Sequence, residues 1–207
     1  MKNNKLIAYL NKEIIPIYDS FDHAHQKSHV FEVINDSIHI AKDYDTDLDM
    51  VYTIACYHDI GIQFGRENHH ITGGLFLFND KNLSEFFSHD QLITMKEAVE
   101  DHRASSKNPP RSIYGKIIAE ADRQIDLESI CVRTIQFGLK HYPDINQEEH
   151  IARAINHLHE KYGINGYLNL WLRTKRNEDG LKKIQELLKD EDKMKAFLKD
   201  LYFQQKK

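Results

Sequence analysis

Apolar residues recur along most of this chain with the spacing of an amphipathic helix. Between about residues 29 and 42, Val30, Val33, Ile34 and Ala41 fall on one helical face, together with the small Ser37. Proline and glycine, which interrupt helices, number only 4 and 9 among 207 residues. Strict alternation of apolar and polar residues, the pattern of a half-buried strand, is missing from the sequence. We therefore predict an all-α fold.

The same periodicity predicts the individual helices. After an amphipathic N-terminal segment they cover about 29–42, 51–58, 70–79, 91–102, 112–126, 128–140, 147–161 and 180–202. Polar runs, glycine and proline predict loops at about 43–48, 61–69, 103–111 and 141–146. At this length we expect a single domain over residues 1–207, with a core of about 20–140 and C-terminal helices of about 147–202 packed on it.

Charge and cysteine content argue against several classes of protein. The 28 Lys and Arg against 32 Asp and Glu give a formal net charge of -4, which predicts no nucleic-acid partner. Two cysteines cannot form a disulfide framework in a chain this long, so a reducing, cytoplasmic location is favoured. Apolar runs stay well short of the roughly 20 residues that span a bilayer, so no membrane partner is predicted. The oligomeric state is open, and a homodimer is one option.

Three polar residues occupy positions that the helical pattern assigns to apolar ones: His58, His102 and Asp122. Burying an imidazole or a carboxylate without a partner is costly, so such groups are normally paired or bound to metal. His29 at the start of its helix and Asp59 beside His58 extend the set. Two imidazoles and two carboxylates form a suitable ligand set for one divalent ion, with Mn, Fe, Mg, Ni and Co as candidates.

Each member of this set has a simpler explanation when it is taken alone. One histidine on an apolar face is more often a hydrogen-bonded core residue than a ligand. A His-Asp pair also occurs at His89 and Asp90, where Ser88 or Asp90 is explained as a helix N-cap. Only the ordered set of five residues is specific, although the chain contains 13 histidines.

Other conspicuous residues are expected to be structural. The run from Leu75 to Phe78 is apolar on all sides and predicts a buried helix. Cys56 and Cys131 lie within apolar helical patterns and have no partner spacing for zinc, so both are predicted to be core residues.

The segments HVFEVINDSIHIA, IACYHDIGI and AVEDHRASSKNPPRSIYGKIIAEADRQID resemble the HD superfamily of metal-dependent phosphohydrolases, whose pattern is H…HD…D. This resemblance covers about residues 20–140, and similarity to short, mostly uncharacterised bacterial HD hydrolases extends it over most of the chain. It implies an HD-domain helical bundle with a C-terminal helical extension. It also implies that His58 and Asp59 are catalytic and that the metal ligands are His29, His58, Asp59 and Asp122.

A second metal ion is implied by the segment HHITGG. His70 and Gly73 resemble the H-x-x-G segment of two-metal HD enzymes, including bacterial diadenosine tetraphosphate hydrolases and HD-GYP phosphodiesterases. With His102, His70 would hold this second ion and Asp59 would bridge the pair, while His69 is the alternative inward neighbour. One ion per chain instead of two stays open. The chain has Ile62 where many two-metal relatives have a lysine, which weakens any transfer of a particular substrate.

The resemblance implies hydrolysis of a nucleotide or another small phosphorylated metabolite by metal-activated water. Cationic residues near the ligands are candidates for holding the substrate phosphate, with salt bridging as the alternative for each: Arg66, Arg103, Lys107, Arg111 and Arg123. Two other functions remain open, a di-iron HD-fold oxygenase and a non-catalytic nucleotide-binding sensor. Iron content with an optical signature would indicate the first, and nucleotide binding without hydrolysis would indicate the second.

Overall fold

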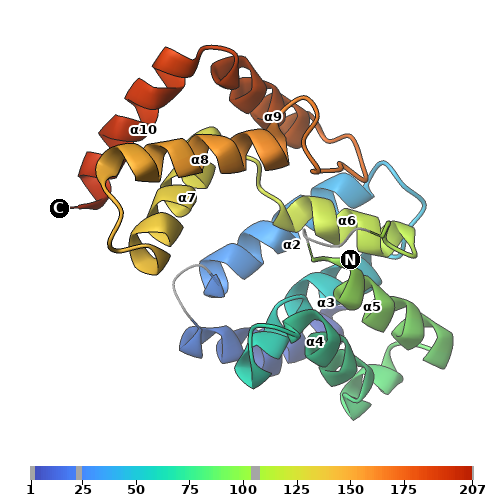
Figure 1. The fold of residues 1–207 in the computed structure, drawn as a ribbon. Helices are drawn as coiled ribbons and strands as arrows, with labels where there is room; N and C mark the ends of the chain where they lie inside the picture. Colours follow the sequence, from blue (N-terminus) through green and yellow to red (C-terminus); the bar gives the residue numbers. More distant parts are fainter. Residues whose placement is uncertain (1–2, 22–24, 104–107, 207) are drawn as a thin grey trace. The chain divides into compact units, whose positions relative to one another are not determined.

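The computed structural model describes residues 3–21, 25–103 and 108–206, and throughout these ranges the regular structure is helical, which confirms the predicted all-α class (Figure 1). The chain forms two compact units, Met1–Arg123 and Gln124–Lys207. The helix at Leu127–His141, which the sequence prediction included in the core, contacts helices of the second unit. Packing of the C-terminal helices on the core stays a prediction.

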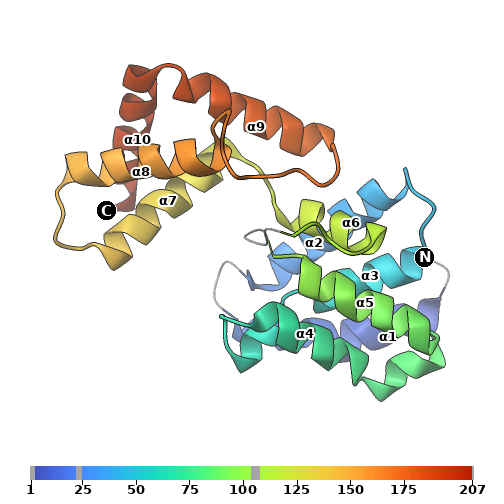
Figure 2. The ribbon, with the colours of Figure 1, turned by 45° about the vertical axis from the view of Figure 1, so that its right-hand side comes forward.

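Among the described residues, the N-terminal unit has six α-helices joined by shorter helical turns. The α-helices are α1 (Asn4–Tyr9), α2 (Lys27–Ala41), α3 (Leu48–Tyr57), α4 (His69–Phe78), α5 (His89–Asp101) and α6 (Ile113–Asp122). The turns are η1 (Leu10–Ile14), η2 (Ile15–Ser20), η4 (Ile60–Phe64) and η5 (Lys81–Glu85). Figures 1 and 2 show α4 alongside α5, and α2 packs against both α3 and α6.

Side-chain caps fix where four of these helices begin, including α1, whose N-cap is Asn3. The side chains of Asp47, Ser88 and Ser112 accept hydrogen bonds from backbone N–H groups in the first turns of α3, α5 and α6. Ser88 and Gln91 form a reciprocal capping box, which confirms Ser88 as an N-cap. Each such cap stabilises its helix by about 1 kcal/mol. Residues such as Val33, Ile54 and Met95 then fill the core of the unit, together with Cys56.

The C-terminal unit is a bundle of four helices with its own core: α7 (Leu127–His141), α8 (Gln147–Tyr162), α9 (Lys175–Leu188) and α10 (Glu191–Gln205). Ile135, Ile151, Leu158 and Leu198 are buried between these helices, together with Cys131. Both cysteines are therefore core residues, as predicted.

Two predictions about helices are wrong. The expected helix at 180–202 is two helices, because the Asp190 side chain accepts a hydrogen bond from the Lys193 N–H and begins α10. The run from Leu75 to Phe78 is not buried on all sides, since Leu77 is fully buried whereas Leu75 is 44% exposed. The α4 helix lies against α5 and η4, which cover only part of its circumference.

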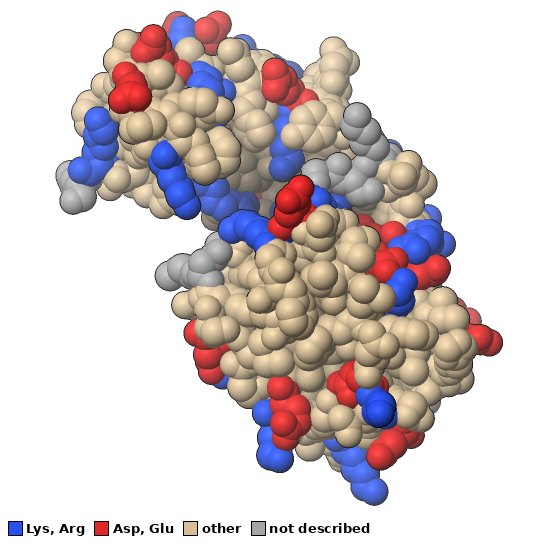
Figure 3. Space-filling view, turned by 60° about the horizontal axis from the view of Figure 1, so that its bottom comes forward, with Lys and Arg blue, Asp and Glu red and all other residues tan. Residues whose placement is uncertain are grey.

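The surface carries charges of both signs. Figure 3 shows a face on which Lys and Arg side chains are interspersed with Asp and Glu, with areas free of both between them. Across the part of the chain that the structure describes, none of the helices is long and apolar enough to cross a membrane.

Candidate metal centre

Five helices of the N-terminal unit bring imidazole and carboxylate groups together at or near their ends. Two groups lie in the first turns of α2 and α4, and the others lie at or just beyond the C-termini of α3, α5 and α6. A helix C-terminus carries a partial negative charge, so three of these ends favour a cation. In chain order the groups are His29, His58, Asp59, His69, His102 and Asp122.

The first cluster consists of His29, His58, Asp59 and Asp122, whose donor atoms all lie within 4.8 Å of one another. His29 Nε2 lies 3.1 Å from Asp122 Oδ1, and His58 Nε2 lies 3.3 Å from Asp59 Oδ2. Donor atoms that each lie about 2.1 Å from one ion are separated from one another by roughly 3–4 Å. The distances between donor atoms in this cluster are therefore close to those around a bound divalent ion. The structure brings together all four residues of the predicted first site, and their role as ligands stays a prediction.

The second cluster consists of Asp59, His69 and His102, again with donor atoms within 4.8 Å of one another. Asp59 Oδ1 lies 3.3 Å from His69 Nε2 and 3.4 Å from His102 Nε2. The other oxygen, Oδ2, faces the first cluster. The Asp59 carboxylate therefore presents one oxygen to each cluster, which is the arrangement of a bridging ligand.

Backbone carbonyls fix the orientation of three of the imidazoles. The Nδ1 atoms of His58, His69 and His102 lie 2.8, 2.8 and 2.6 Å from the carbonyl oxygens three residues earlier. A carbonyl can only accept, so each Nδ1 carries a proton that it donates, and each Nε2 is the ring atom that faces a cluster. Metal-binding histidines in proteins are commonly oriented in this way.

One close contact between imidazoles fits a cation in the first cluster. His58 is fully buried, and its Nε2 lies 3.4 Å from Nε2 of His29. Nε2 is the His58 atom that faces this neighbour, because Nδ1 is bonded to the Ala55 carbonyl. A positive ion between the two nitrogens would accept both lone pairs, so the donor set suits a divalent metal.

Both carboxylates of the centre are held in their ionised form. Burial alone would raise the pKa of Asp59, but His58 and His102 outweigh it and hold this pKa well below its usual range. Burial likewise opposes ionisation of Asp122, and the hydrogen bond with His29 lowers its pKa all the same. Ionised oxygens are the form that binds divalent cations.

A glycine allows α4 to approach the turn that follows Asp59. A Cβ atom on Gly61 would lie 1.9 Å from the carbonyl oxygen of His69 and 2.5 Å from the backbone nitrogen of Gly73. The Thr72 hydroxyl donates to the Gly61 carbonyl at 3.2 Å across the same contact. Only glycine fits this position, and the close approach brings His69 to Asp59.

His69, and not the predicted His70, belongs to the second cluster. The α4 helix begins at His69, one residue earlier than the sequence pattern indicated. Neighbouring residues of a helix point about 100° apart, so His70 cannot share the direction of His69, and it lies outside the cluster. Sequence analysis left His69 as the alternative, and no signal in the sequence distinguished two adjacent histidines at a helix start.

The predicted phosphate-binding cations separate into two groups. Arg111 forms ion pairs with three carboxylates of α5, and Arg123 lies 2.8 Å from Glu120 in a buried pair. These two arginines therefore adopt the salt-bridging alternative. Arg66 and Arg103 lie beside the second cluster, because the Arg66 carbonyl accepts from His69 and Arg103 directly follows His102. Lys107 lies outside the described residues.

Both clusters lie in the part of the chain that matches a known protein family. Residues 27–125 match the HD domain family, and this range contains all six clustered residues. Among solved structures, the chain is similar to the crystal structure of a predicted HD superfamily hydrolase from an uncultured Thermotogales bacterium. The two share 24% sequence identity over 73% of this chain and 83% of the other, with a TM-score of 0.49. No curated protein matches the chain significantly.

Proposed function

Because residues 27–125 match the HD domain family, we propose that this protein is a metal-dependent phosphohydrolase that acts on a nucleotide or another small phosphorylated metabolite. The observation that carries the proposal is the position of Asp59, whose two oxygens face two separate clusters of imidazoles. A shared carboxylate of this kind favours two ions per chain over one.

The two clusters divide the ligands between two ions. The first ion would be held by His29, His58, Asp59 and Asp122, and the second by Asp59, His69 and His102. Divalent ions supply an activated water at neutral pH and neutralise charge on the phosphoryl oxygens. The protein contributes carboxylates that are ionised and imidazoles that are already oriented, so little reorganisation is needed on binding.

Several groups beside the centre are suited to phosphate oxygens. Within the part of the chain that the structure describes, neither Gln26 nor Asn68, the N-cap residues of α2 and α4, caps its helix through its side chain. Helix N-termini with unbonded N–H groups attract anions. Arg66 and Arg103 add positive charge next to the N-terminus of α4, where Arg103 donates to the Glu67 carbonyl at 3.1 Å. We assign these groups to the substrate phosphate.

Asp59→Asn tests the proposal directly. The amide cannot bridge two cations as a carboxylate does, so the variant should retain little metal and hydrolyse no phosphorylated substrate above background. The measurements are metal content of the purified protein, and phosphate release from nucleoside mono-, di- and cyclic phosphates with Mn, Co, Ni or Fe added. A wild-type protein that binds none of these metals and hydrolyses nothing would contradict the proposal, and iron-dependent oxygen uptake would point to an oxygenase.

Two adjacent histidines supply a matched control. His69→Ala should remove the second ion and most of the activity, whereas His70→Ala should leave both within about twofold of wild type, as expected of a side chain outside the clusters. Far-ultraviolet circular dichroism checks that both variants are folded. Equal losses in the two variants would show that the second cluster does not bind metal as assigned.

A further inference from the structure

The turn between α3 and η4 carries two residues of the candidate metal centre, His58 and Asp59. The α3 helix ends at Tyr57 and η4 begins at Ile60, so both residues lie outside the two helices. The regular hydrogen bonds of a helix do not fix residues beyond its end, and other groups must hold them. The hydrogen bonds made to this turn therefore bear on the positions of both side chains.

Side chains complete the hydrogen bonding at the C-terminus of α3. The last carbonyl groups of a helix have no partner within that helix. His58 Nδ1 lies 2.8 Å from the Ala55 carbonyl oxygen, and the Tyr18 hydroxyl donates to the Cys56 carbonyl at 2.9 Å. The first of these bonds comes from a candidate ligand, whereas the second reaches the end of α3 from η2. Tyr18 therefore fixes the end of this helix from a separate part of the chain.

The Tyr18 side chain is itself held in place. It is fully buried, and its ring meets that of Phe21 edge to face, with centroids 5.0 Å apart. Its ring also lies alongside that of His58, with 24° between the two planes and 6.5 Å between the centroids. Burial raises the pKa of Tyr18 well above its usual value, although a hydrogen bond with the Asp59 backbone opposes the rise. The hydroxyl therefore stays protonated and remains a donor to the end of α3.

We propose that Tyr18 is a positioning residue of the metal centre, whose hydroxyl holds the turn that carries His58 and Asp59 in the geometry that binds metal. Tyr18 precedes residues 27–125, the part of the chain that matches the HD domain family. A segment outside the family match thus contributes to the centre without supplying a ligand. The inference rests on the proposed binding of metal, so its test includes the wild-type chain.

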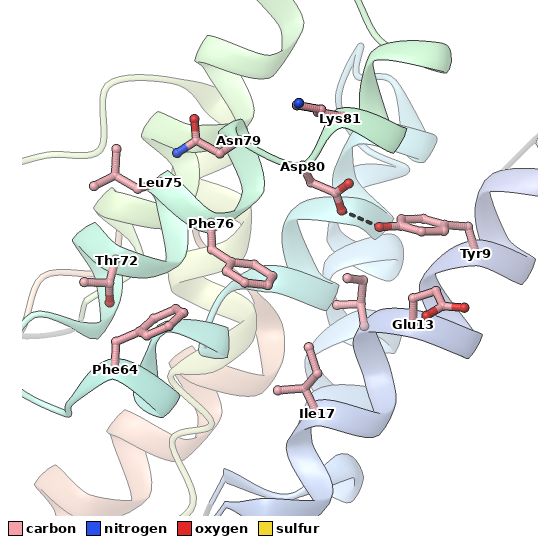
Figure 4. Close-up of a pocket in the computed structure, with 11 residues that line it drawn as sticks. Tyr9, Glu13, Ile17, Phe64, Thr72, Leu75, Phe76, Asn79, Asp80 and Lys81 are labelled. Atoms are coloured by element: carbon pink, nitrogen blue, oxygen red, sulfur yellow. Dashed lines mark hydrogen bonds between the residues drawn. The ribbon is translucent and has the colours of Figure 1, made fainter.

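Tyr57 provides a matched control on α3 itself. Like Tyr18 it is fully buried, but its hydroxyl donates to Asp80. Asp80 also accepts from Tyr9 and lines a cavity of about 610 Å³ beside Leu75, as Figure 4 shows. Among the described residues, the lining of this cavity includes none of the six clustered ones. Replacing Tyr57 by phenylalanine therefore removes a buried hydrogen bond and leaves the bond at the end of α3 in place.

Titration of the metal-free full chain with Co²⁺, followed by visible absorption, tests the proposal. Tyr18→Phe keeps the ring and removes only the hydroxyl, so it should bind the first ion about tenfold more weakly than wild type. Its absorption band should also shift, because the spectrum of Co²⁺ depends on the geometry of its ligands. Tyr57→Phe should bind within about twofold of wild type and keep the wild-type band. Both variants should unfold a few degrees below wild type when free of metal, since each loses one buried hydrogen bond.

Phe21→Leu separates the hydroxyl of Tyr18 from the packing of its ring. This variant loses the edge-to-face contact and keeps the bond to the Cys56 carbonyl. Its affinity for Co²⁺ should stay within about threefold of wild type, even if it unfolds at as low a temperature as Tyr18→Phe. A tenfold loss in Phe21→Leu would show that packing of the ring, and not the hydroxyl, holds the turn, and would overturn the proposal.

The outcomes distinguish this inference from the proposed function. A loss of Co²⁺ affinity with a shifted band in Tyr18→Phe alone supports the positioning role. Wild-type binding by Tyr18→Phe, or the same loss in Tyr57→Phe, would overturn that role and leave metal binding by the wild type standing. A wild-type chain that binds no divalent ion would overturn the proposed function and this inference together.

Discussion

The Glu100 carboxylate of α5 is largely buried between two cations. Its oxygens are 2.6 Å from Lys96 Nζ and 2.7 Å from Arg111 Nη2. Partial burial would raise the pKa of Glu100, but the hydrogen bonds with Lys96 and Arg111 outweigh it and lower this pKa below its usual value. A carboxyl whose pKa is lowered in the folded state stabilises that state above the unfolded pKa of about 4.3.

We expect Glu100→Gln to reduce the free energy of unfolding at pH 7 by about 0.5–1 kcal/mol, a modest value because solvent screens the pair. The stabilisation is lost as the pH falls through the folded pKa, so variant and wild type should be equally stable near pH 3. Urea unfolding at both pH values measures this. Glu97→Gln, whose carboxylate lies 3.4 Å from Arg111, should have a smaller effect. A difference that persists near pH 3 would contradict an ionic origin.

Single residues show where sequence reasoning succeeds and where it stops. His58 and Asp122 were found because a polar side chain interrupts an apolar helical face, and the structure places both in the first cluster. Arg111 and Arg123 could not be separated from Arg66 and Arg103, because their carboxylate partners depend on folded geometry. Sequence proximity to a ligand does not reveal whether a cation is already paired.

At the scale of elements, the contact between η4 and α4 sets the position of His69. The contact depends on Gly61, since a Cβ there would lie 1.9 Å from the carbonyl oxygen of His69. Two backbone segments cannot both shift to accept a methyl group without moving the residues that they carry. The geometry of the second cluster therefore depends on Gly61, a residue outside the cluster that has no side chain.

Gly61→Ala should separate η4 from α4, reduce the free energy of unfolding by about 1–3 kcal/mol and weaken retention of the second ion. Thermal unfolding and metal analysis measure the two effects. Gly73→Ala is the graded control, because its nearest contacts would be 3.3–3.4 Å away and require only small shifts. The interpretation fails if Gly73→Ala is as damaging as Gly61→Ala.

The positions at which helices begin and end were harder to predict from the sequence than the presence of the helices. The apolar pattern continues through Leu188 and Leu198, so periodicity alone joined α9 to α10. The break is produced by the Asp190 cap, a local hydrogen bond that the apolar pattern does not contain. At Ser88 the cap was found because polar residues followed an apolar run and preceded a new helical pattern.

At the scale of the whole molecule, every residue of the candidate metal centre belongs to the N-terminal unit. The C-terminal unit has a separate core, which includes Ile151, Leu158 and Leu198. A ligand that binds only the folded state stabilises the part of the chain whose unfolding releases it. Metal binding should therefore act on the two units differently.

Hydrogen exchange with and without a saturating divalent metal tests this expectation. A ligand present at 100 times its dissociation constant adds about 2.7 kcal/mol to the free energy of unfolding of the part that binds it. Core amides of α2, α3 and α6 should therefore exchange about 100-fold more slowly. Core amides of α8 and α10 should be unchanged. Equal protection of both cores would show that the two units unfold together. Asp59→Asn, which should not retain metal, serves as the control.

The overall class was predictable from the periodic pattern of apolar residues, which also singled out His58 and Asp122, whereas His29 and Asp59 joined the predicted first site through the resemblance to HD hydrolases. The division into two compact units at Arg123 and Gln124 was not predictable, since composition and helical periodicity continue across it. The cavity beside Leu75 was also missed, because an apolar run gives no sign of which side its neighbours leave uncovered.

The shared Asp59 carboxylate has a consequence for the order in which ions would be taken up. The first cluster offers four donors and the second offers three, of which one is common to both. Once an ion occupies the four-donor cluster, its positive charge opposes a second cation a few ångströms away and draws electron density from the common carboxylate. Loading would then be sequential and negatively cooperative. Under metal scarcity the chain would hold one ion, and its activity would rise with the availability of the second.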